Sequence, residues 1–127
     1  MKKILCKSYE EMSKAGADEI LKEVKSNPSC VLGLATGATP VGMYKELIKM
    51  YEDGKIDFSA VKSYNLDEYY PIEKNHKNSY NYFMRDNLFN HININPDNTH
   101  IPNGMAEDYE AECKKYEEMI EKEGGID

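Results

Sequence analysis

The sequence predicts an α/β fold in which helices cover a doubly wound, mostly parallel sheet. Short apolar segments alternate along the chain with longer segments of helical periodicity, and this alternation is typical of parallel sheets. Residues Cys30–Ala35 form an apolar run without polar alternation, as expected of a central strand buried on both faces. The 127 residues carry no repeat or linker and fit one α/β domain, residues 1–127.

The first elements follow from local signals. Lys2–Cys6 is predicted to be a short strand. Ser8 and Glu11 form a capping-box pattern that predicts the start of a helix, and Asn27-Pro28 predicts its end. After the strand at Cys30–Ala35, Thr39 is expected to cap the next helix and Pro40 to be its first residue.

The remaining elements continue the alternation. That second helix is expected to end near Asp53-Gly54. The later predicted elements are a strand at Val61–Leu66, a helix near Ser79–Phe89, a short strand at Thr99–Ile101 and a helix over about Ala106–Glu121.

Composition excludes several classes of protein. Sixteen Lys and Arg residues against 23 Asp and Glu residues give a net charge of −7, which argues against nucleic-acid binding. We see no signal peptide and no apolar stretch of membrane-spanning length, so we expect a cytoplasmic protein without a membrane partner. The three histidines have no partner at ligand spacing, so no metal site is predicted; they are His76, His91 and His100.

A small-residue loop joins the buried strand to the second helix. Thr36, Gly37, Ala38 and Thr39 would let an anion approach backbone N–H groups beside a helix N-terminus. The loop lacks the spacing of a Walker motif. A plain strand–helix turn, with Thr39 only as a cap, is an equally good reading of this pattern.

Two adjacent carboxylates, Asp67 and Glu68, follow the next strand. A partly buried carboxylate at a strand end can serve as a general base, and only one of the two needs to face the cleft. A solvated acidic turn is the alternative. Because ligands of such sheets bind beyond the carboxyl ends of the strands, the loop and the carboxylate together favour proton abstraction from a phosphorylated substrate.

Several motifs resemble those of the glucosamine-6-phosphate deaminase (isomerase) family. The segments Leu32–Pro40 and Asn65–Tyr69 match its phosphosugar loop and catalytic-base motif, and Ser79-Tyr80, Asn103-Gly104 and Cys113–Glu117 also fit. The resemblance implies a Rossmann-like partial domain of the glucosamine-6-phosphate deaminase and ribose-5-phosphate isomerase type. It also implies conversion of glucosamine 6-phosphate and water to fructose 6-phosphate and ammonia.

The resemblance also implies roles for residues. Asp67 would transfer the proton between C2 and C1 of the opened sugar. Substrate binding would involve Thr36, Gly37, Ala38, Thr39, Glu68 and Tyr80. A small sugar phosphate is the implied ligand, no cofactor is implied, and the full-length enzyme is expected to be a homo-oligomer.

The chain departs from the family pattern at Ala38, where the family has glycine, and at Pro71 in the loop after the base. It covers about the first half of such an enzyme, so we expect the 127-residue chain alone to be inactive. The alternatives are a 6-phosphogluconolactonase-like hydrolase and a non-catalytic sugar-phosphate-binding domain.

Overall fold

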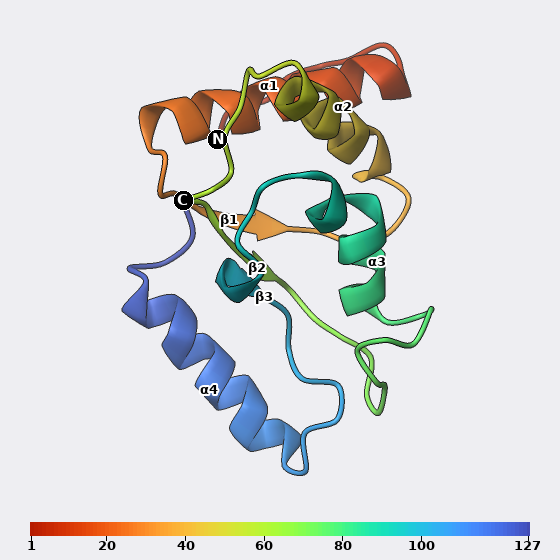
Figure 1. The fold of residues 1–127 in the computed structure, drawn as a ribbon, viewed down its shortest axis with the longest axis vertical. Coiled ribbons are helices and arrows are strands. Elements are labelled where there is room, and N and C mark those ends of the chain that lie inside the picture. The colour runs from red at the N-terminus through yellow and green to blue at the C-terminus, as the bar shows by residue number, and fades with distance from the viewer.

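The computed structural model describes residues 1–127 and contains four α-helices and three β-strands (Figure 1). In chain order these are α1 (Tyr9–Ser26), β1 (Val31–Leu34), α2 (Val41–Glu52), β2 (Lys62–Asn65), α3 (Tyr80–Asn87), β3 (Thr99–His100) and α4 (Tyr109–Lys122). Two short 3-10 turns, η1 (Phe89–His91) and η2 (Pro96–Asn98), connect α3 to β3. No helix is both long and apolar enough to cross a membrane.

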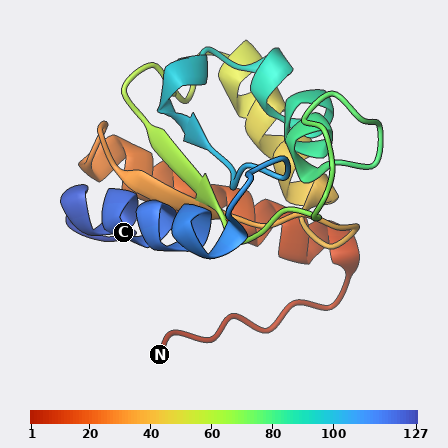
Figure 2. The same cartoon turned by 90° about the horizontal axis from the view of Figure 1, so that it is seen from below.

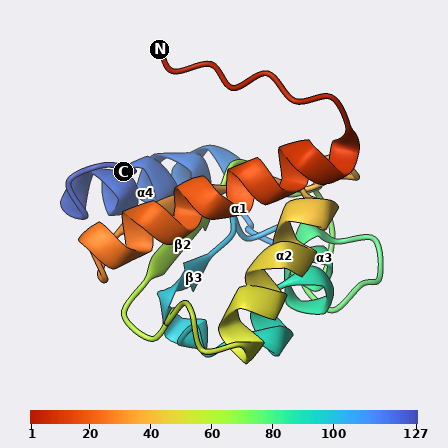
Figure 3. The same ribbon diagram turned by 90° about the horizontal axis from the view of Figure 1, so that it is seen from above.

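The three strands form one parallel sheet in the order β1-β2-β3. Leu34 of β1 pairs with Asn65 of β2, so both strands reach the same edge of the sheet. Helices α1, α2 and α3 lie on one side of the sheet and α4 lies on the other (Figures 1 and 3). The predicted α/β class with a doubly wound parallel sheet is therefore confirmed.

Each face of the sheet has its own apolar core. The larger one lies under α1 and α2, and Tyr44, Leu47 and Phe58 are its largest fully buried side chains. On the opposite face, Tyr116 of α4 packs with Val31 and Tyr64. The periodic apolar stripes of the helices account for this division, because each amphipathic helix must bury one face.

The N-terminal segment corrects one sequence expectation. Residues 2–6 form no strand, and the tail stands apart from the sheet and runs back alongside α1 (Figures 2 and 3). Leu5 is 95% exposed, and Lys2 instead pairs with Glu19 of α1 at 2.8 Å. Three apolar residues between lysines offer no face that a sheet could bury, so propensity alone does not hold this segment in a strand.

The start of α2 corrects a second expectation. The helix begins at Val41, its N-cap residue is Pro40, and this residue makes no capping hydrogen bond with its side chain. Pro40 has φ −81° and ψ −8°, and its carbonyl oxygen accepts the N–H of Tyr44 at 2.9 Å, so the first helical hydrogen bond forms one residue later than the Thr39 cap would require. The other predicted elements lie at the expected places, with ends shifted by at most three residues.

Candidate active site

The carboxyl ends of β1 and β2 open into a small cavity. Its volume is about 200 Å³, and it is lined by Leu34, Ala35, Thr36, Asn65, Leu66, Asp67 and Tyr80. Three candidate residues from distant parts of the sequence, Thr36, Asp67 and Tyr80, therefore meet at one site. This is the edge of a parallel sheet at which ligands bind.

The loop between β1 and α2 presents unused hydrogen-bond donors. None of the backbone N–H groups of residues 36–39 donates a hydrogen bond within the chain. Gly37 has a φ of +95°, a conformation that side chains disfavour, and no acidic residue lies in the first turn of α2. Free N–H groups beside a helix N-terminus are what an anion requires.

Ala38 fits this loop without strain. No residue other than glycine has a positive φ, so the methyl group of Ala38 meets no backbone conflict. The loop is anchored to α2 from inside, because the Tyr44 hydroxyl donates to the Ala35 carbonyl oxygen. Burial raises the pKa of Tyr44 strongly, which keeps this donor protonated.

Asp67 supplies the free carboxylate of the cavity. It lies two residues beyond the end of β2 and is exposed, and its side chain accepts no hydrogen bond from the rest of the chain. Its charge is one of the factors that raise the pKa of Tyr80, so the two groups are close enough to interact. A carboxylate that faces a cavity without a protein partner is available for proton transfer.

Tyr80 lies next to residues of both loops at the site, Thr36 before α2 and Tyr69 before α3. Its ring packs on Tyr69 with the ring centroids 4.7 Å apart. The hydroxyl of Tyr69 and partial desolvation raise the pKa of Tyr80, whereas the nearby Thr36 hydroxyl lowers it. The net rise keeps the phenol protonated at neutral pH, so Tyr80 can donate to a bound ligand.

Glu68 has other partners in the structure. Its carboxylate accepts hydrogen bonds from the backbone N–H groups of Tyr80 at 2.8 Å and Asn81 at 2.9 Å, and from its own neighbour Tyr69 at 2.9 Å. Both carboxylate oxygens are thus used at the N-terminus of α3. Of the two adjacent carboxylates, only Asp67 faces the cavity.

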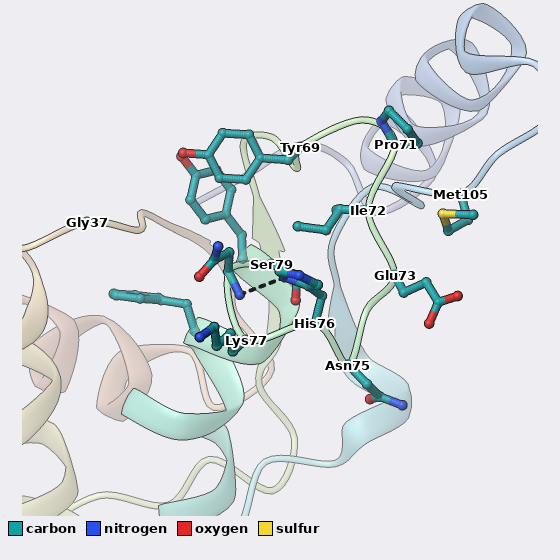
Figure 4. Close-up of a pocket in the computed structure, with 13 residues that line it drawn as sticks. Gly37, Tyr69, Pro71, Ile72, Glu73, Asn75, His76, Lys77, Ser79 and Met105 are labelled. Carbon is teal, nitrogen blue, oxygen red and sulfur yellow. Dashed lines mark hydrogen bonds between the residues drawn. The ribbon is translucent and has the colours of Figure 1, made fainter.

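A larger, open cavity of about 1040 Å³ adjoins the small one through Tyr80 (Figure 4). Figure 4 shows Gly37 on one side of it and Ile72 and Met105 on the other. The loop between β2 and α3 forms much of its wall, so a ligand with its anionic group at Gly37 would have room to extend here.

Sequence reasoning missed two residues of the site. Tyr69 was named only as the end of the Asn65–Tyr69 motif, with no role of its own, but its ring supports Tyr80. Asn65 is 2% exposed, and its Nδ2 donates to the carbonyl oxygen of Leu34 at 2.7 Å. This bond joins β1 to β2 at the mouth of the site. The one sequence signal for a role of Asn65 was its place near the end of a predicted strand, just before the carboxylate of Asp67.

The fold and this strand-edge site define an α/β protein with a candidate anion site at the carboxyl edge of its parallel sheet. The model of the family described as glucosamine-6-phosphate isomerases/6-phosphogluconolactonase matches residues 7–126. The chain belongs to this family.

Within this family, the chain is similar to curated glucosamine-6-phosphate deaminases. The chain is 61% identical over 127 residues to a glucosamine-6-phosphate deaminase of Thermoanaerobacter sp. (strain X514), and it covers 50% of that protein. It is 58% identical to the enzyme of the same description from Clostridium perfringens (strain 13 / Type A), of which it covers 52%. The chain thus spans about half the length of the curated relatives it matches.

Two solved structures of proteins in this family have a similar fold. A monomeric glucosamine-6-phosphate deaminase superposes with a TM-score of 0.97 at 41% identity, over 100% of this chain and 53% of that one. The 6-phosphogluconolactonase of Thermotoga maritima gives a TM-score of 0.74 at 18% identity, over 94% of this chain and 52% of that one. The second similarity shows a shared fold alone.

Proposed function

We propose that residues 1–127 supply the general base and part of the phosphate site of a glucosamine-6-phosphate deaminase. The enzyme would convert glucosamine 6-phosphate and water to fructose 6-phosphate and ammonia. The observation that carries the proposal is the meeting of Thr36, Asp67 and Tyr80 in one cavity, beside four unused N–H donors of residues 36–39.

In this proposal the 6-phosphate binds the free N–H groups and hydroxyls of residues 36–39. The open-chain sugar then extends toward Asp67. The carboxylate of Asp67 takes the proton from C2 and returns it to C1, and a second proton passes from the C2 ammonium group to O1. The aldehyde and the C2 amine thereby become a C1 alcohol and a C2 imine. Water hydrolyses the imine to the ketone and releases ammonia.

The chain holds no residue that we can assign to opening of the sugar ring, and its net charge is −7. The basic groups that usually complete a phosphate site would come from the second half found in the relatives. We therefore expect negligible deaminase turnover from the 127-residue chain. Measurable turnover by this chain alone would contradict that expectation.

A chimera tests the assignment. Residues 1–127 are joined to the second half of the Thermoanaerobacter relative, and fructose 6-phosphate formation is measured. We expect activity in the chimera and a loss of kcat of at least about 100-fold in Asp67→Asn, the usual effect of removing a general base. Asp97→Asn, at an exposed carboxylate in η2, is the matched control.

Unchanged activity in Asp67→Asn would refute the base assignment. The same chimera is assayed with 6-phosphogluconolactone. Hydrolysis of the lactone without deamination would favour the hydrolase alternative, and tight sugar-phosphate binding without either reaction would favour a binding domain.

A further inference from the structure

The hydroxyl of Tyr9 joins two parts of the chain that are distant in sequence. It donates to the carbonyl oxygen of Ala38 at 2.9 Å and accepts from the backbone N–H of Gly42 at 2.8 Å. Tyr9 is the first residue of α1, whereas Ala38 lies in the loop before α2 and Gly42 in the first turn of α2. One phenol on a neighbouring helix therefore bridges this loop to its own helix.

We propose that Tyr9 is a positioning residue for the anion-binding loop, an inference that rests on the proposed function of that loop. The N-cap residue of α2 makes no side-chain hydrogen bond, and the N–H of Gly42, one of the first four of the helix, has no backbone acceptor and needs a partner. Tyr9 provides that partner at Gly42. The hydroxyl of Thr39, expected from sequence to cap the helix, is consequently left free for a ligand.

The contact with Ala38 sets the direction of the next donor. In a planar trans peptide the C=O and the following N–H point in opposite directions. Because Tyr9 holds the Ala38 carbonyl on the α1 side, the N–H of Thr39 points to the other side. The hydroxyl thus orients a donor that it does not itself touch.

Close packing supports the same role. A Cβ added at Gly42 would lie 2.8 Å from Cε1 of Tyr9 and 2.2 Å from Oγ of Ser13. Contacts below 3.0 Å force neighbouring atoms to shift, so only glycine lets the ring of Tyr9 approach α2 this closely. The position of the hydroxyl is therefore fixed by packing as well as by its two hydrogen bonds.

The test uses amide NMR of the 127-residue chain with inorganic phosphate as the probe. In the wild-type chain we expect phosphate to shift the amide signals of residues 36–39. Tyr9→Phe removes one oxygen from a side chain that is 46% exposed. We expect it to weaken phosphate binding by about 5-fold, the effect of one hydrogen bond, and to speed hydrogen exchange at Gly42.

The matched control is Tyr82→Phe, because Tyr82 is 41% exposed and its hydroxyl takes part in no hydrogen bond. It should bind phosphate as the wild type does. Equal affinity in wild type and Tyr9→Phe would overturn the role of Tyr9. Absence of phosphate shifts in the wild type would instead count against the proposed function.

A second measurement needs no substitution. Coupling between two events is reciprocal, so if the Tyr9 bridge favours binding, phosphate must stabilise the bridge. In the wild-type chain, saturating phosphate should slow hydrogen exchange of the Gly42 N–H, which donates to the Tyr9 hydroxyl. An unchanged rate at Gly42, with shifts present at residues 36–39, would also overturn the proposal.

Discussion

The carboxylate of Glu68 accepts the backbone N–H of Tyr80 at 2.8 Å, twelve residues further along the chain. Glu68 directly follows Asp67, the proposed base. Its bond to Tyr80 fixes the start of α3, from which the Tyr80 side chain enters the cavity. A negative charge at a helix N-terminus is also favourable. The position of Tyr80 relative to Asp67 thus depends on the Glu68 side chain, which joins the end of the β2 segment to the start of α3.

Replacement of Glu68 should therefore destabilise the domain. Glu68→Ala leaves the N–H groups of Tyr80 and Asn81 without their acceptor, and we expect a loss of about 1–3 kcal/mol in the free energy of unfolding. Glu68→Gln keeps one acceptor oxygen and should lose less. Urea denaturation measures both, with Glu73→Ala in the same exposed loop as control. Equal stability of Glu68→Ala and the control would contradict this role.

Gly104 should tolerate no side chain. A Cβ there would lie 2.6 Å from the carbonyl oxygen of Ile72 and 2.7 Å from that of Tyr69. Both are backbone atoms of the loop after the proposed base, which cannot yield without moving Tyr69. We expect Gly104→Ala to lower the free energy of unfolding by about 1–3 kcal/mol, the usual cost of overpacking, as measured by urea denaturation.

The control for Gly104 is Gly16→Ala in α1. There the nearest atom is Sδ of Met43 at 2.9 Å, in a flexible side chain that can move, and alanine favours the helix. We expect a change smaller than about 1 kcal/mol. A larger loss at Gly16 than at Gly104 would show that the loop adapts and the helix contact does not.

The stability of the domain should fall as the pH drops below about 6.5, the ordinary pKa of histidine. Burial lowers the pKa of His100, whose ring stacks on Tyr64 at 4.4 Å. The unfolded chain then binds the proton more readily than the folded one, so stability is complete above that pH and decreases as the pH falls toward the folded pKa.

Thermal unfolding at several pH values between 5 and 8 measures this effect. His100→Phe keeps a ring on Tyr64 and should flatten the dependence in that range. His76→Gln, which removes an exposed histidine, is the matched control. A dependence that is equally steep in His100→Phe and in the wild type would assign it to other groups.

Tyr116 should hold α4 to the sheet. Its hydroxyl lies 2.7 Å from the carbonyl oxygen of Asn65 and 3.0 Å from that of His100, so one phenol bridges the ends of β2 and β3. Tyr116→Phe should cost about 1 kcal/mol and speed hydrogen exchange of α4 amides. Tyr109→Phe, at an exposed tyrosine of the same helix, is the control, and identical exchange in the two variants would contradict the bridge.

Local signals predicted local structure well. Ser8 caps α1 as its motif indicates, with the Glu11 N–H 3.1 Å from its hydroxyl oxygen, because both partners lie within one helical turn. The uninterrupted apolar run likewise predicted β1. Thr36 and Asp67 were expected near one another because parallel strands end at a common edge, and Tyr80 was expected at the site only from the family resemblance. The cavity brings the three together.

The missed features depend on contacts between distant segments. The partner of Glu68 lies twelve residues away, and Tyr9 reaches a carbonyl 29 residues away. Such contacts depend on how helices cross, which no short sequence window encodes. For the same reason Thr39 was expected to cap α2, since nothing near it in sequence shows that a tyrosine on another helix satisfies the first turn.

The anchor between Tyr44 and Ala35 has a consequence for the speed of ligand capture. Tyr44 holds the first carbonyl of the loop as Tyr9 holds the Ala38 carbonyl, so both ends of the loop are restrained before any ligand arrives. Little conformational entropy then remains to be lost on association. Phosphate should therefore enter in a single rapid step, without a slow rearrangement that follows first contact.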